Sequence, residues 1–146
     1  MWVRLQSDTE IPGDRIPPWR AAVNESAGAV SLSDKLLVLN SKDAEHGMEL
    51  WVHESPQPGI RLLKDIQPGA ESSDPGQYIF WKGKAIFQAR TTEQGMEPWI
   101  TDGTPEGAVQ LGDLYPGSDG SAPYGFVDAG ERVFFRAHDS EHGHEL

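Results

Sequence analysis

Carboxylates are the groups in this chain best suited to chemistry, and they gather at three turns that contain glycine. The glycines of these turns follow one another at intervals of 48 residues and are Gly47, Gly95 and Gly143. The acids that could ligate a cation at the first and last turns are Asp43, Glu45, Asp139 and Glu141. The remaining acids of the three turns are Glu49, Glu93, Glu97 and Glu145. Carboxylate oxygens suit Ca²⁺, which takes about six to eight oxygen ligands, so the sequence offers a calcium site.

A second interpretation of these turns is purely structural. The acids do not have the spacing of an EF-hand loop, and Thr91 stands in the middle turn where Asp43 stands in the first. Short acidic side chains also cap turns by accepting hydrogen bonds from the backbone. Under this interpretation the chain needs no cofactor.

Other catalytic chemistry receives little support from the sequence. His46, His142 and His144 lie near the turns, but the middle copy has Gln94 and Met96 in the equivalent places, so a repeated metal site is not expected. The chain has no cysteine and therefore no thiolate nucleophile or disulfide. It has no Gly-x-Ser-x-Gly nucleophile turn, and its acids are too numerous to single out a glycosidase pair. We therefore expect a protein that is not an enzyme.

Composition narrows the class of protein further. The 146 residues carry a formal net charge of -11, with only 12 Lys and Arg, which disfavours nucleic acid and anionic membrane surfaces as partners. No apolar run is long enough to span a membrane. The 16 Gly and 11 Pro favour short strands joined by many turns over long helices.

The turns belong to a longer repeated unit. Apolar runs at residues 36–39, 84–87 and 132–135 precede them and predict buried strands. With three further strands after each of the first two turns, the chain has four short strands per 48 residues, the period of a β-propeller blade. We expect an all-β fold of about three such blades forming an incomplete ring. The predicted units are an irregular partial blade at 1–35, repeats at 36–83 and 84–131, and the start of a further blade at 132–146.

Several repeated residues have predicted structural roles. Gly47, Gly95 and Gly143 should supply a positive φ that lets the chain reverse. Trp51 and Trp99 share one register in the second strand, and each should fill the space between adjacent blades. The alternative, a ring of sugar-stacking aromatics, would need these indoles on exposed loops. Asp102-Gly103-Thr104 predicts an Asx-type turn, and Asp65 and Asp113 should accept hydrogen bonds in the Pro-Gly turns that follow them.

The repeat resembles that of the bacterial ELWxxDGT-repeat proteins. The best copy runs from Gly95 through Glu97, Trp99 and Asp102 to Gly107, and the segment 113–117 supplies its Pro-Gly tail. The earlier copy keeps Gly47, Glu49, Leu50 and Trp51 but has Glu54-Ser55-Pro56 in place of Asp-Gly-Thr. The resemblance covers residues 36–146 well and implies a propeller-like fold, often in surface or secreted bacterial proteins. It implies no reaction.

These observations lead to one favoured function and two alternatives. We expect a non-enzymatic structural or interaction module, outside the cytoplasm or at the surface of a bacterium, within a larger protein or assembly. The last copy of the repeat stops before its Trp, so protein partners or further blades are expected to complete the ring. The alternatives are a carbohydrate-binding, lectin-like propeller and a propeller hydrolase with acids lining a central channel.

Overall fold

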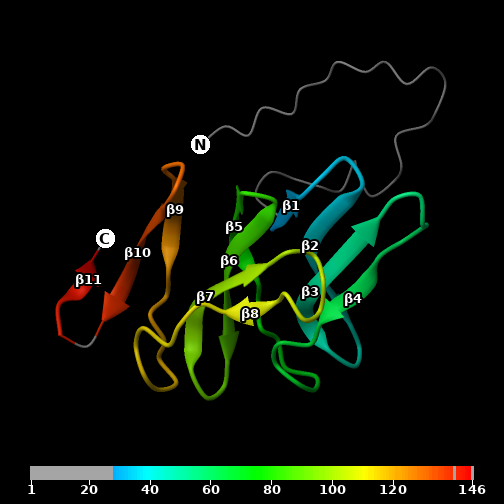
Figure 1. Cartoon of the computed structure of the whole chain (residues 1–146). Helices are drawn as coiled ribbons and strands as arrows, with labels where there is room; N and C mark the ends of the chain where they lie inside the picture. Colours follow the sequence, from blue (N-terminus) through cyan, green and yellow to red (C-terminus); the bar gives the residue numbers. More distant parts are fainter. Residues whose placement is uncertain (1–27, 140, 146) are drawn as a thin grey trace.

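The computed structural model describes residues 28–139 and 141–145, and every regular element in these ranges is a β-strand (Figure 1). The first sheet is formed by β1 (Ala29–Ser31), β2 (Leu36–Asp43), β3 (Gly47–Glu54) and β4 (Arg61–Lys64). The second is formed by β5 (Gly76–Trp81), β6 (Lys84–Thr91), β7 (Gly95–Thr101) and β8 (Val109–Gln110). The third is formed by β9 (Tyr124–Asp128), β10 (Val133–Asp139) and β11 (Gly143–Glu145). The expected all-β class is confirmed.

Each sheet is an antiparallel meander, because successive strands are joined by short turns and pair with their neighbours in the chain. The three apolar runs predicted from sequence lie in β2, β6 and β10, which are inner strands of their sheets. The β2–β3 and β6–β7 hairpins have the same register, with Leu39 opposite Trp51 and Phe87 opposite Trp99. The 48-residue spacing therefore places equivalent residues at equivalent points of two sheets.

The sheets and the sequence repeats are offset from each other by one strand. The repeat at 36–83 ends with the segment that forms β5, yet β5 pairs with β6 and so belongs to the second sheet. The cause is local, because Lys82 and Gly83 both have positive φ, 49° and 79°, and this two-residue turn folds β5 directly onto β6. Likewise β1, from the predicted irregular region, pairs with β2. The rest of this predicted partial blade, residues 1–27, lies outside the described residues.

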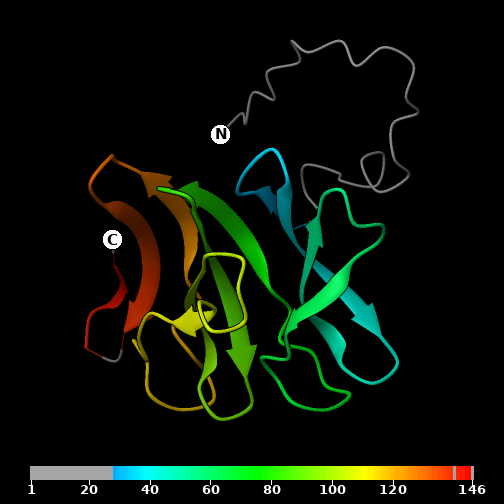
Figure 2. The ribbon, with the colours of Figure 1, turned by 45° about the vertical axis from the view of Figure 1, so that its right-hand side comes forward.

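The sheets lie side by side in chain order, and their facing sides form the core (Figure 2). Between the first and second sheets, Val38, Leu50 and Val52 pack in one buried cluster with Phe87 and Trp99. Between the second and third sheets, the buried cluster is smaller and its members are Ile79, Ile86 and Phe126. Aromatic pairs support both interfaces, since the Tyr78 and Phe87 rings stack with centroids 5.3 Å apart, and Phe126 and Phe135 have centroids 5.1 Å apart.

Candidate functional site

The glutamate of the repeated phrase is buried and anchors a loop. Glu49 on β3 has no exposed surface and accepts hydrogen bonds from the segment that links β4 to β5. Its Oε2 accepts from the Ile66 amide at 2.9 Å and the Ser73 hydroxyl at 2.6 Å. Its Oε1 accepts from the Gln67 amide at 3.3 Å and the Ser73 amide at 2.9 Å. This carboxylate thus satisfies the backbone donors at both ends of the loop.

The second sheet repeats the arrangement. Glu97 on β7 is 1% exposed, and its Oε2 accepts from the Leu114 amide at 3.1 Å and the Ser121 hydroxyl at 2.6 Å. Its Oε1 accepts from the Tyr115 amide at 3.2 Å and the Ser121 amide at 2.9 Å. The interpretation of Glu49 and Glu97 as members of the acidic turns is therefore wrong. Their side chains point inward, because the loop amides need an acceptor there.

The same finding corrects the expectation for the aspartates of the Pro-Gly turns. The amides of Ile66 and Gln67, which follow Asp65, donate to Glu49, and the Asp113 carboxylate accepts from the Gln94 side chain at 3.3 Å. Sequence reasoning also missed Ser73 and Ser121. Their signal was present, because each occupies the same place between a Pro-Gly turn and a proline.

Each of these serines also connects two sheets. Ser73 donates to Glu49 of the first sheet, while its carbonyl accepts from the Arg90 amide of the second at 2.8 Å. Ser121 donates to Glu97 of the second sheet, and its carbonyl accepts from the His138 amide of the third, also at 2.8 Å. At both interfaces, therefore, a serine links the buried carboxylate of one sheet to a backbone amide of the next sheet.

Burial sets the electrostatics around Glu49. Loss of solvent raises the pKa of its carboxyl above the usual value, although the hydrogen bonds from Ser73, Ile66 and Gln67 act in the opposite direction. Burial also raises the pKa of the Tyr78 phenol, with a smaller contribution from the charge of Glu49. The phenol therefore stays protonated near neutral pH, and the carboxylate oxygens of Glu49 are committed to the loop.

The turn glycines adopt the predicted conformation where the structure describes it. Gly47 and Gly95 have φ of 65° and 68°, so the expected positive φ is confirmed for these two. They also allow a close approach, because a Cβ on Gly95 would lie 2.4 Å from the Gly120 nitrogen, and one on Gly47 would lie 2.6 Å from the Glu71 carbonyl oxygen. The turn and the anchored loop thus touch backbone to backbone.

The candidate calcium ligands are engaged with their own turns. Asp43 Oδ1 accepts from the amides of Glu45 and His46 at 2.9 and 2.7 Å, and His46 Nδ1 lies 2.9 Å from both carboxylate oxygens. The side-chain hydrogen bond is the main reason that the pKa of Asp43 is lowered and the pKa of His46 is raised. In the middle turn the Thr91 hydroxyl accepts from the Gln94 amide at 3.2 Å, which explains how Thr replaces Asp there.

The third turn repeats this capping. Asp139 Oδ1 accepts from the amides of Glu141 and His142, and these bonds lower the pKa of the Asp139 carboxyl. Glu45 and Glu141 are exposed, and the two acid pairs lie in turns of different sheets. Within residues 28–139 and 141–145 no group of three or more His, Cys, Asp or Glu is arranged to hold a metal. Capping by Asp43 and Asp139 is confirmed, and the calcium site stays a prediction.

The Asp-Gly-Thr segment is a local turn, as predicted. Asp102 Oδ1 accepts from the Thr104 hydroxyl at 2.7 Å and from its amide at 2.9 Å, and these bonds lower the pKa of Asp102. Gly103 lies against Leu36 of the first sheet, where a Cβ would come within 2.4 Å of a Leu36 methyl carbon. The segment therefore helps to seat the second sheet on the first.

The repeated tryptophans occupy equivalent positions with different surroundings. Trp99 is 8% exposed and shares a buried cluster with Ile66, Phe87 and Ala89, so the expected packing between sheets is confirmed for this residue. Trp51 is half-buried on the side of the first sheet that faces away from the second. Neither lies on an exposed loop.

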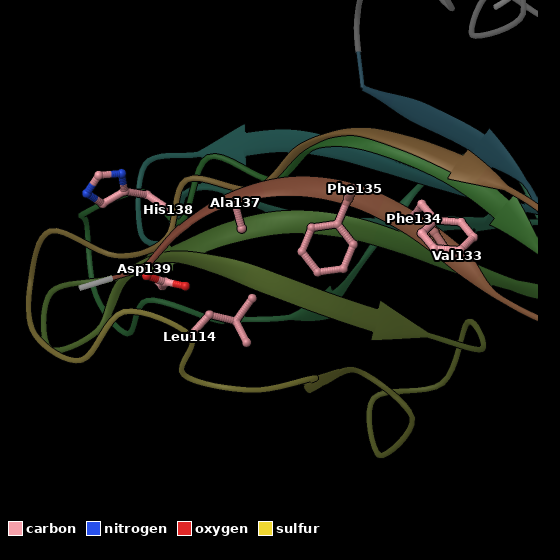
Figure 3. Close-up of a pocket in the computed structure, with 7 residues that line it drawn as sticks. All are labelled: Leu114, Val133, Phe134, Phe135, Ala137, His138 and Asp139. Carbon is pink, nitrogen blue, oxygen red and sulfur yellow. The ribbon is translucent and has the colours of Figure 1, made fainter. Parts of the chain in front are cut away.

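A pocket of about 460 Å³ opens beside β10 (Figure 3). Its lining residues are Leu114, Val133, Phe134, Phe135, Ala137, His138 and Asp139. Phe135 and Ala137 project from β10 toward Leu114, whereas His138 points away from it (Figure 3). Leu114, Phe135 and Ala137 lie 48 positions after Ile66, Phe87 and Ala89, the residues that surround Trp99. The pocket therefore corresponds to the place that an indole fills between the first two sheets.

Comparisons with known proteins assign no family and no function to this chain. No family model, no curated protein and no solved structure matches the chain. In the described ranges no helix is long and apolar enough to cross a membrane.

Proposed function

We propose that this chain is a non-enzymatic structural and interaction module, a segment of a β-propeller of the ELWxxDGT-repeat kind. Each four-stranded sheet is one blade, and the third sheet begins another. The module serves as a scaffold within a larger protein or assembly, outside the cytoplasm or at the surface of a bacterium. Its partners are further blades of the same type.

The outer face of the third sheet carries this proposal. Val127 and Phe134 are paired across β9 and β10 and are 51% and 44% exposed. The residues 48 positions earlier, Ile79 and Ile86, form the same cross-strand pair in the second sheet and are only 6% and 4% exposed. The earlier pair is covered by the next sheet. The later pair presents the same apolar surface to a further one.

The use of the polar groups supports a scaffold over an enzyme. Glu49 and Glu97 are saturated by loop amides and serine hydroxyls, and Asp43 and Asp139 cap turns. Repeated residues thus hold the sheets and turns in place, and the exposed apolar face is left for association.

The test is the oligomeric state of the purified chain. Light scattering coupled to size exclusion should give a mass that rises with concentration above the 16.1 kDa of one chain. Val127→Asp should shift the protein toward the monomer, because a carboxylate cannot be buried between two sheets without a partner. Leu111→Asp is the matched control, since Leu111 is 50% exposed but does not belong to this face.

The proposal fails if the chain stays monomeric at high concentration and Val127→Asp leaves its behaviour unchanged. Circular dichroism of both variants would establish that they keep the strand content of the parent chain.

A further inference from the structure

We propose that Glu49 and Ser73 form a pH-sensitive pair, which binds a proton inside the fold and holds the loop between β4 and β5 more tightly as the pH falls. Both side chains are fully buried, Glu49 on β3 and Ser73 near the end of that loop. The inference goes beyond the scaffold function, because it gives the first sheet a response to acidity.

The first observation is the position of the serine hydroxyl. Ser73 Oγ lies 2.6 Å from Glu49 Oε2 and 3.5 Å from the Met48 carbonyl oxygen. A hydroxyl can donate one hydrogen bond while it accepts another, and a protonated carboxyl can donate one. When Oε2 takes up a proton, its O–H can donate to Ser73 Oγ, and the serine hydrogen can turn to the Met48 carbonyl. Both protonation states of Glu49 therefore keep their bond to Ser73.

The second observation is that the other bonds of Glu49 are compatible with this reversal. The amides of Ser73 and Gln67 donate to Oε1, at 2.9 and 3.3 Å. The proton would occupy the place on Oε2 that the serine hydrogen leaves, so the Ile66 amide, 2.9 Å from Oε2, can still donate there. Ser73 also accepts from the Arg90 amide of the second sheet at 2.8 Å, so the pair acts on the interface as well as on the loop.

The second sheet lacks the second acceptor. Ser121 Oγ donates to Glu97 Oε2 at 2.6 Å, and among the described residues its hydroxyl has no other acceptor. A reversed hydroxyl at Ser121 would leave its hydrogen unpaired in a buried place, which is unfavourable. The response to acidity is therefore expected at Glu49.

Burial gives the response its direction. Loss of solvent raises the pKa of Glu49, and the hydrogen bonds from Ser73, Ile66 and Gln67 oppose this effect without cancelling it. The folded protein then binds this proton more tightly than the unfolded chain does. The resulting stability is fully present below the pKa of an unfolded glutamate and is lost as the pH rises through the raised pKa.

Other titratable and charged groups lie on the elements that pack against Glu49. They are His46 in the β2–β3 turn, Asp65, Glu71 and Asp74 in the loop, Tyr78 on β5 and Arg90 on β6. The Tyr78 phenol stays protonated, because burial raises its pKa. The Arg90 guanidinium bonds to Asp74 and to the Ser72 carbonyl, each at 3.2 Å. Within the described residues the Glu49 carboxyl bonds only to the loop amides and the Ser73 hydroxyl.

The full chain can be tested without a substitution. Carbon-13 NMR of the side-chain carboxyl groups should give Glu49 a titration midpoint above the usual glutamate value of about 4.3. The Met48 carbonyl resonance should shift with the same midpoint, because it gains the serine hydrogen bond. The Met96 carbonyl is the control, since the Ser121 hydroxyl does not reach it, and it should not shift at this midpoint.

Stability across the pH range gives a second test. Between pH 7 and 4, urea unfolding should show the ratio of folded to unfolded protein rising about tenfold for each unit by which the pKa of Glu49 is raised. Glu49→Gln, which cannot take up a proton, should lose this part of the pH dependence. Glu93→Gln removes one charge at an exposed position of the next sheet and should keep it.

Three results would overturn the proposal. They are a Glu49 midpoint at or below the usual glutamate value, a Met48 carbonyl that does not follow the midpoint, and equal pH profiles for Glu49→Gln and Glu93→Gln. If Glu49→Gln does not fold, the NMR titration of the parent chain still decides.

Discussion

Glu97 shows how a charged residue in a repeated phrase can serve the fold. The carboxylate lies in a nearly closed environment and accepts from three loop amides and one hydroxyl. Accepting four hydrogen bonds requires two oxygens with several lone pairs. An uncharged amide side chain has only one accepting oxygen, so it could satisfy only some of these donors. The residue is thus specified by the donors around it.

Replacing Glu97 with Gln should lower the free energy of unfolding by about 3 kcal/mol. The amide NH₂ would face loop donors in place of one accepting oxygen, so two hydrogen bonds would be lost and donors left unsatisfied. Chemical denaturation measures the change. Glu93→Gln, at an exposed position of the neighbouring turn, should change stability by less than about 0.5 kcal/mol. Equal stabilities for the two variants would contradict the role given to Glu97.

At the scale of elements, the β6–β7 hairpin and the loop after β8 form one unit. The Ala122 amide donates to the Met96 carbonyl at 2.9 Å, and Met96 and Gly120 form a parallel bridge. The first sheet repeats the contact, because the Asp74 amide, 48 positions before Ala122, donates to the Met48 carbonyl at 3.2 Å. Hairpin and loop therefore depend on each other, and glycine is required where their backbones meet.

Gly95→Ala should destabilise the protein by at least about 2 kcal/mol, since the new Cβ would meet the Gly120 backbone and the residue would hold an unfavourable φ. Gly83→Ala separates the two causes. Gly83 also has a positive φ, 79°, but no atom lies within 4 Å of the point that a Cβ would occupy, so only the backbone strain, about 1 kcal/mol, should appear. Thermal unfolding of both variants would measure the difference, and equal losses would show that the close approach is unimportant.

For the whole molecule, the two sheet interfaces differ in completeness. The interface between the first and second sheets buries Phe87 and Ala89 fully and Trp99 almost fully. The interface between the second and third sheets leaves Phe135 half-buried beside an open pocket. Stability should therefore be concentrated in the first interface, and the third sheet should be the more responsive to a partner.

Truncation of equivalent phenylalanines tests this asymmetry. Phe87→Ala should cost about 4 kcal/mol, because it leaves a cavity in a closed cluster, whereas Phe135→Ala should cost about half as much. Denaturation with urea gives both values. A larger loss at Phe135 than at Phe87 would reverse the assignment of the dominant core.

Much of the architecture is readable from the sequence. Runs such as 84–87, the turn residues and the 48-residue interval specify short strands in an all-β fold, because strand period and turn chemistry are local properties. The same locality explains why capping by Asp43 and the turn at Asp102 were predictable. Each needs only neighbours two or three residues away.

Tertiary structure alone decided the roles of Glu97 and of the β10 pocket. The donors to Glu97 lie 17 to 24 residues further along the chain, so no local pattern distinguishes it from an exposed turn acid. The pocket likewise joins Leu114 of one sheet's loop to Phe135 of the next sheet. The sequence by itself determined the strands, turns and repeat. Which groups are buried and which surface is left open depended on how the sheets stack, because burial arises from contacts between segments distant in the chain.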